Sequence, residues 1–188
     1  ILKKLLPYKT DFELIRLGDD NDGGYLIPDD LLNITKNYSA GVGNLTKFEL
    51  DLEKKYSISS KMIDLNDVDL KLLPITSEFQ KKKIGISSYG ENLSINEWLN
   101  SDKGEIILKM DIEGDEYATL SAISDENLNK IRILVLEIHD LRHLRNYSFY
   151  KIFEKVLSRL NHFFYVCHLH INNVSSIKEI GGYDIPDM

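Results

Sequence analysis

Apolar and polar positions along this chain follow two periods, and each period predicts one kind of element. Short, largely apolar runs predict six strands, over residues 37–40, 61–64, 82–87, 105–111, 131–140 and 163–170, and a glycine turn over residues 41–44 follows the first of them. Apolar residues three and four positions apart predict helices, after residues 45, 94 and 114 and over residues 147–160. Strands therefore alternate with helices, which predicts an α/β fold with an open, doubly wound, mostly parallel sheet.

The two ends of the chain carry weaker patterns than its middle. We expect residues 1–188 to form a single domain, in which residues 1–30 comprise a lead-in, helical or irregular over residues 1–17, and the Asp-Gly-Gly-Tyr turn, and residues 37–188 form the sheet core. The Asp-Gly-Gly sequence at residues 22–24 lies between two apolar stretches and predicts an acidic hairpin turn. Residues 181–186 are expected to form a loop, without a closing strand.

Two of the expected helices begin with the spacing of a capping box. Thr46 and Glu49 are three residues apart, and Ser94 and Glu97 repeat this spacing, so hydroxyl and carboxylate are expected to cap each first turn. The first of these helices presents one apolar face, formed by Leu45, Phe48, Leu52 and Tyr56.

Composition and charge narrow the class of protein. The formal net charge of −7 argues against a general nucleic-acid binder, which would carry a basic face. The single cysteine, Cys167, excludes an internal disulfide framework and fits a reducing compartment such as the cytoplasm. Since no apolar run approaches the length of a membrane span, we expect no transmembrane segment.

The turn after the first strand, Gly41-Val42-Gly43-Asn44, is the most informative local pattern. A strand, a glycine turn and a helix together form the place where α/β proteins hold nucleotide-like cofactors. No Gly-Lys-Ser/Thr follows the glycines, which excludes a Walker loop, and the missing third glycine argues against a dinucleotide pyrophosphate. S-adenosylmethionine (SAM), which has no phosphate, is compatible with this turn, and so is a purely structural role.

Polar side chains follow several of the expected strands. Asp64 lies about twenty residues after the glycines, the spacing at which a carboxylate binds ribose hydroxyls, although such an acid can also cap a turn. Asp111 ends the fourth strand, and His139 and Asp140 end the fifth. Because open α/β sheets bind ligands at the carboxyl ends of their strands, we expect one site along this edge.

Two motifs together resemble a known family. The sequence Lys109-Met110-Asp111-Ile112-Glu113-Gly114-Asp115-Glu116 resembles the K-x-D-[IV]-E-G-x-E signature of FkbM-type SAM-dependent methyltransferases. Asp22-Gly23-Gly24-Tyr25 resembles the D-G-G-Y element of a branch related to the methyltransferase-like proteins. Residues 137–139 and 168–173 are similar to that branch, so the resemblance covers most of the chain after Arg16.

The resemblance implies a class I methyltransferase fold, SAM as the cofactor, and O-methylation of a sugar, a glycan precursor or another small molecule with a hydroxyl group. It also implies a final antiparallel hairpin, which we expect to be incomplete in this chain. The residues expected at the cofactor are Asp22, Gly23, Gly24, Tyr25, Gly41, Gly43, Asn44, Asp64, Ser87 and Asp111. Among these, Gly41, Gly43 and Asn44 would lie by the methionine part of SAM, Asp64 would hold the ribose, and residues 22–25 would close the site.

Methyl transfer to a hydroxyl needs a group that removes a proton, or a metal ion. His139 is the first candidate base, because imidazole titrates near neutral pH. Asp111 could orient His139 or accept the proton itself, and His170 is the next candidate base. Asp111, His139 and Asp140 could alternatively hold Mg²⁺ or Mn²⁺, since carboxylates and imidazole suit these ions.

Two other classes of protein fit part of the pattern. An NAD(P)-binding oxidoreductase would also use the glycine turn and Asp64, although the missing third glycine and the Asp-Ile-Glu-Gly turn speak against it. A non-catalytic partner in a glycan-synthesis complex could retain the fold alone. The identity of the acceptor and the oligomeric state do not follow from the sequence.

Overall fold

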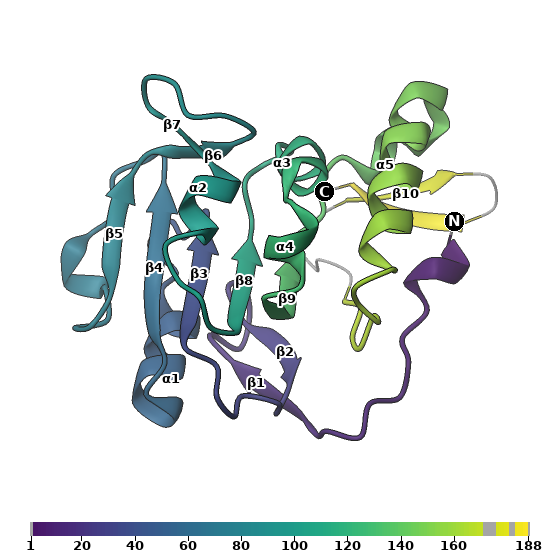
Figure 1. Ribbon diagram of the computed structural model, residues 1–188. Coiled ribbons are helices and arrows are strands. Elements are labelled where there is room, and N and C mark those ends of the chain that lie inside the picture. The colour runs from purple at the N-terminus through teal and green to yellow at the C-terminus, as the bar shows by residue number, and fades with distance from the viewer. Residues whose placement is uncertain (1, 171–175, 181–182, 188) are drawn as a thin grey trace.

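The computed structural model describes residues 2–170, 176–180 and 183–187, and its centre is a five-stranded parallel sheet (Figure 1). The strand order is β5-β4-β3-β8-β9, and each neighbouring pair runs parallel. The strands are β3 (Lys36–Ala40), β4 (Ser59–Asp64), β5 (Glu78–Lys81), β8 (Ile106–Met110) and β9 (Ile131–Leu136). In chain order this is 3-2-1-4-5, the arrangement of a doubly wound sheet, so the α/β prediction is confirmed.

Helices cover both faces of the sheet. On one face, α1 (Lys47–Tyr56) packs against β8 and β9. The other face is covered by α2 (Ile95–Leu99), α3 (Glu116–Ala122), α4 (Asp125–Leu128) and α5 (Tyr147–Leu160). The side chains of β8 alternate between these two layers, with Ile107 on the α1 side and Leu108 on the other, as the pleat of a strand requires.

A hairpin near the N-terminus completes the α1 side. Strands β1 (Leu14–Leu17) and β2 (Tyr25–Pro28) pair antiparallel around the Asp-Gly-Gly sequence, which confirms the expected hairpin turn. Leu17 and Ile27 are buried in the same cluster as Phe48 of α1 and Val135 of β9. The hairpin therefore holds residues 22–25 beside the carboxyl end of the sheet.

Short elements occupy the connections. They are η1 (Leu2–Leu5), η2 (Leu70–Leu72), η3 (Leu141–Arg145) and the small parallel pair β6 (Lys83–Gly85) and β7 (Asn92–Ser94). η1 lies against the end of α5, where Asn161 donates to the carbonyl of Lys4. Within the described part of the chain, no helix is both long and apolar enough to cross a membrane.

Three predictions about the strands are wrong. The third expected strand, residues 82–87, becomes β6 outside the main sheet, and the preceding segment 78–81 takes the sheet position instead. Residues 163–170 form an irregular segment beside residue 8, whose backbone N–H donates to the carbonyl of Val166. The tail is not a loop, since β10 (Ser176–Ile180) and β11 (Tyr183–Asp187) pair antiparallel, although they form a sheet of their own.

Neither expected capping box forms. Thr46 donates its hydroxyl to the carbonyl of Leu72, and the Glu49 carboxylate turns inward to Ser39. Ser94 likewise makes no side-chain cap, and Glu97 accepts a hydrogen bond from Ser88. Long-range partners therefore replace the local reciprocal bonds at both helix starts.

Candidate functional site

The candidate site lies where the strand order reverses, between the carboxyl ends of β3 and β8. Ligands of open α/β sheets bind at this switch point, because the connections leave it in opposite directions. The backbone N–H of Gly41 donates to Ile63, and that of Asp111 donates to Ala40, so the three strand ends are tied together. The glycine turn, Asp64 and Asp111 thus meet at one edge, as the sequence predicts.

The two glycines of the turn have different surroundings. Gly41 has a φ of +73°, and a Cβ built on it would lie 1.5 Å from the carbonyl oxygen of Asp111. Gly41 is therefore required for the contact between β3 and β8. Gly43 also has a positive φ, of +49°, but a Cβ there would meet no atom within 4 Å. The backbone of Gly43 consequently faces open space, where a ligand can approach it.

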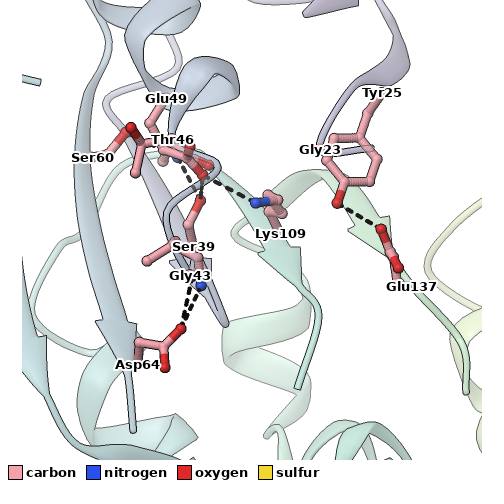
Figure 2. Close-up of polar contacts among 12 residues, drawn as sticks. Gly23, Tyr25, Ser39, Gly43, Thr46, Glu49, Ser60, Asp64, Lys109 and Glu137 are labelled. Carbon is pink, nitrogen blue, oxygen red and sulfur yellow. Dashed lines mark hydrogen bonds and ion pairs between the residues drawn. The ribbon is translucent and has the colours of Figure 1, made fainter. Parts of the chain in front are cut away.

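The carboxylate of Asp64 holds the glycine turn (Figure 2). Its Oδ2 accepts hydrogen bonds from the backbone N–H of Val42 at 3.0 Å and of Gly43 at 2.9 Å. Its Oδ1 accepts the backbone N–H of Asn66 at 2.7 Å. A carboxylate has about four acceptor positions, so about one remains on Asp64 for a ligand. The ribose role of Asp64 stays a prediction.

The Asp-Gly-Gly-Tyr turn packs directly on the glycine turn. A Cβ built on Gly23 would lie 3.1 Å from the Cβ of Leu45, which directly follows the glycine turn. Asp22 accepts the backbone N–H of Gly23, and the Asn44 side chain accepts that of Asp69. Residues 22–25 are thereby brought to the site, as expected.

Tyr25 joins this turn to the end of β9. Its hydroxyl donates to Oε1 of Glu137 at 2.9 Å, as Figure 2 shows, and its ring lies edge-on to Phe48 with centroids 5.5 Å apart. Burial, and then the negative charge of Glu137, raises the pKa of Tyr25 well above its ordinary range. Tyr25 therefore keeps its proton and remains a hydrogen-bond donor at neutral pH.

Lys109 and Glu49 form a buried ion pair next to the ring of Tyr25. The Nζ of Lys109 is 3.4 Å from Oε1 of Glu49, and both side chains are almost completely buried. The ammonium also lies 5.4 Å from the ring centroid of Tyr25 and 5.9 Å from that of Phe48. Lys109 thus neutralises the Glu49 carboxylate and makes a cation–π interaction with the Tyr25 ring.

A second group of polar side chains lies at the ends of β8 and β9. One ligand atom each from Asp111, Glu137 and His139 lies within 4.8 Å of the others. Burial and the nearby Glu137 carboxylate raise the pKa of Asp111 to about 7. Two carboxylates and an imidazole close together in a partly buried position are typical of catalytic and ligand-binding sites.

His139 is held in one orientation by Glu116. Its Nδ1 donates to Oε1 of Glu116 at 2.9 Å, and that carboxylate in turn accepts the backbone N–H groups of Ile112 and Gly114. The hydrogen bond to Glu116 raises the pKa of His139 to about 9, although burial opposes this shift. His139 is therefore protonated at neutral pH when nothing else binds it. Burial disfavours the charge of Glu116, but the bonds from His139 and the backbone outweigh it and lower the Glu116 pKa.

Three predicted site residues lie elsewhere in the described structure. Asp140 has a φ of +63° and its carboxylate lies 3.1 Å from Arg142, so Glu137 and not Asp140 joins Asp111 and His139. His170 stacks on His168 with ring centroids 6.2 Å apart, in the irregular segment after α5. Ser87 lies in an exposed bend after β6. The predicted similarity at residues 171–173 lies outside the described residues.

Sequence reasoning missed Glu49, Lys109 and Glu137 as parts of the site. Glu137 interrupts the apolar run that forms β9, and a charged residue in such a run is a signal that could have been used. The same argument applies to Lys109 in β8. Glu49 carries no such signal, because its spacing from Thr46 fits an ordinary helix start.

We compared the chain with models of protein families, with curated proteins and with solved structures, and none of them matches.

Proposed function

We propose that the protein is a SAM-dependent methyltransferase that acts on a hydroxyl group of a sugar, a glycan precursor or another small molecule. The observation that carries this proposal is the position of the Asp64 carboxylate, which occupies the amides of the glycine turn. A dinucleotide would place its pyrophosphate on these amides. A negative carboxylate in that place repels phosphate and favours a cofactor without phosphate.

The charges around the switch point support the same choice. Asp64, Asp111 and Glu137 are all acidic, whereas SAM carries a positive sulfonium and NAD(P) carries negative phosphates. The residues just before α1 are also bound to the chain itself, because Thr46 donates to the carbonyl of Leu72 and the Asn44 side chain accepts the backbone N–H of Asp69. The residues present therefore fit SAM better than they fit a dinucleotide.

The open space at Gly43 and the remaining acceptor position on Asp64 are where the cofactor would contact the chain. When bound, SAM supplies an electrophilic methyl group. The residues of this chain must then position the acceptor hydroxyl and take its proton, and positioning alone lowers such a barrier by several kcal/mol.

Asp111 is a better proton acceptor than His139 in the protein alone. With a pKa raised to about 9, His139 already holds a proton at neutral pH, whereas Asp111, with a pKa of about 7, is roughly half ionised. Oδ1 of Asp111 is buried and finds no hydrogen-bond donor among the residues that the structure describes, so its capacity to accept a proton is not used within the chain. His139 would stabilise the charge on Asp111 from 3.7 Å away.

Isothermal titration of the purified chain with SAM, S-adenosylhomocysteine and NADH tests this proposal. We expect SAM and S-adenosylhomocysteine to bind and NADH not to bind. Asp64→Ala should weaken SAM binding at least tenfold, while Asp67→Ala, a neighbouring acid with a largely exposed side chain, should leave it unchanged. Gly43→Val provides a second variant, since it fills the open space without removing the Asp64 carboxylate.

The two rival classes of protein predict different titrations. Binding of NADH without binding of SAM would identify an oxidoreductase. A folded chain that binds neither cofactor would overturn the methyltransferase proposal. It would favour the hypothesis of a non-catalytic partner in a glycan-synthesis complex.

A further inference from the structure

The three side chains at the ends of β8 and β9 have the composition and spacing of a metal site. Asp111, Glu137 and His139 each offer one ligand atom, and these atoms lie within 4.8 Å of one another. Two ligands of one cation, each bound at about 2.1 Å, are roughly 3 Å apart when adjacent and roughly 4.2 Å apart when opposite. The three side chains are thus close enough to converge on one ion with small rotamer changes.

The orientation of His139 is the one that metal-binding histidines have. Its Nδ1 is bound to Glu116, which leaves Nε2 facing Oδ1 of Asp111 at 3.7 Å and Oε2 of the exposed Glu113 at 3.6 Å. Both separations are too long for a hydrogen bond. Histidine ligands of metals usually donate their other ring N–H to a carboxylate, which fixes the ring and its tautomer. Glu116, itself held by two backbone amides, fills that role.

One of the two carboxylates is held by a hydrogen bond, and the other has an oxygen without a donor. The Tyr25 hydroxyl binds Oε1 of Glu137, so Glu137 is held from the side of the hairpin. Oδ1 of Asp111 is shielded from solvent, yet no donor within the described residues satisfies it. A buried carboxylate oxygen without a donor costs free energy unless a ligand supplies a positive partner.

We propose that Asp111, Glu137 and His139 bind one divalent cation, Mg²⁺ or Mn²⁺. Two carboxylates balance the charge of the ion, and oxygen ligands with one imidazole suit Mn²⁺ and Mg²⁺ better than the soft metals. Three protein ligands leave open positions on an octahedral ion for water or for an oxygen of the acceptor. Binding of the ion does not rest on the proposed function. If both hold, Asp111 is a ligand of the ion and not the proton acceptor, and the ion would lower the pKa of the acceptor hydroxyl.

Titration of Mn²⁺ into the metal-free chain, followed by the electron paramagnetic resonance signal of free Mn²⁺, tests this inference. We expect one saturable site, and Mg²⁺ should compete for it. Asp111→Asn, Glu137→Gln and His139→Gln should each weaken Mn²⁺ binding at least tenfold. Asp140→Asn is the matched control, since its carboxylate contacts Arg142 instead, and it should change the affinity less than twofold.

The inference is overturned if the wild-type chain shows no saturable Mn²⁺ site. It is also overturned if Asp140→Asn weakens binding as much as Glu137→Gln does. Thermal unfolding in EDTA reports whether each variant folds, and if one does not, the other two still decide the result. SAM titration in EDTA separates the two proposals, because Gly43 and Asp64 do not belong to the metal ligands.

Discussion

The hydroxyl of Tyr25 lies 2.9 Å from Oε1 of Glu137 and connects the N-terminal hairpin to the end of β9. This contact joins the Asp-Gly-Gly-Tyr turn, which packs on the glycine turn, to the acidic group at β8 and β9. The two halves of the candidate site are therefore one connected structure.

Tyr25→Phe should destabilise the protein by about 1–2 kcal/mol, because it removes a hydrogen bond to a partly buried carboxylate while keeping the ring. Urea unfolding measures this change. Tyr89→Phe, at an exposed position, should have an effect within about 0.5 kcal/mol. Equal stability of the two variants would mean that Glu137 finds another donor at no cost.

Alanine substitutions at the two glycines should destabilise the protein to different extents. Gly41→Ala should destabilise the chain by more than 2 kcal/mol, about the upper end of the penalty for a left-handed backbone alone, because its Cβ also collides with Asp111. Gly43→Ala should cost only about 1 kcal/mol, since the space there is open. Thermal unfolding compares them, and a Gly43→Ala protein as unstable as Gly41→Ala would contradict the structural difference.

Removal of the Lys109 charge should be more harmful than removal of a surface charge. Lys109→Met leaves the buried Glu49 carboxylate without its cation, which typically costs about 3–5 kcal/mol. Adding Glu49→Gln should recover part of this loss. Lys47→Met, which breaks an exposed pair with Asp19, should cost less than about 1 kcal/mol in the same urea titrations. A double variant no more stable than Lys109→Met would show that the charge of Glu49 is not what destabilises the single variant.

Asp111→Asn should stabilise the metal-free protein at neutral and alkaline pH. The folded state raises the pKa of Asp111 from 3.8 to about 7, so it holds a proton that the unfolded chain releases between these values. The contribution of Asp111 to stability therefore falls as pH rises from about 4 to 7 and is constant above that range. The variant should gain about 1–3 kcal/mol at pH 8 and nothing at pH 4.

Thermal or urea unfolding in EDTA at several pH values checks this effect of Asp111. A gain that is the same at pH 4 and pH 8 would show that the substitution acts through packing and not through the charge. Asp67→Asn serves as the control, because its carboxylate is at the surface.

The local pattern of apolar and polar residues was sufficient to predict the longest helix and the central strands of the sheet. The helix at residues 147–160 has the predicted bounds, since its apolar period is regular and Asn146 caps its first turn. The strand at residues 78–81 was missed because it lies at the edge of the sheet, where only Phe79 is partly buried and polar side chains are tolerated. The run at residues 163–170 has strand-like composition, but it stays irregular and does not pair with the free edge of β9, and its Val166 carbonyl instead accepts the backbone N–H of Tyr8.

The candidate site was predictable in its position and less so in its members. Glycines and acids that follow buried strands must meet at one edge of a parallel sheet, so Gly41, Asp64 and Asp111 were found. Whether Asp140 or Glu137 joins them depends on the left-handed turn of the backbone at Asp140, which no local pattern reveals. The inward turn of Glu49 depends on Lys109, 60 residues further along the chain.

The separation of Tyr25 and Glu137 by 112 residues also sets an order of events during synthesis. At typical translation rates of about 5–20 residues per second, roughly 6–22 seconds pass between the two residues. During that interval, Leu17 and Ile27 of the hairpin lack Val135, with which they later form a buried cluster. The newly made hairpin is then an exposed apolar segment, and the ribosome-bound chain should stay sensitive to protease there until β9 has emerged.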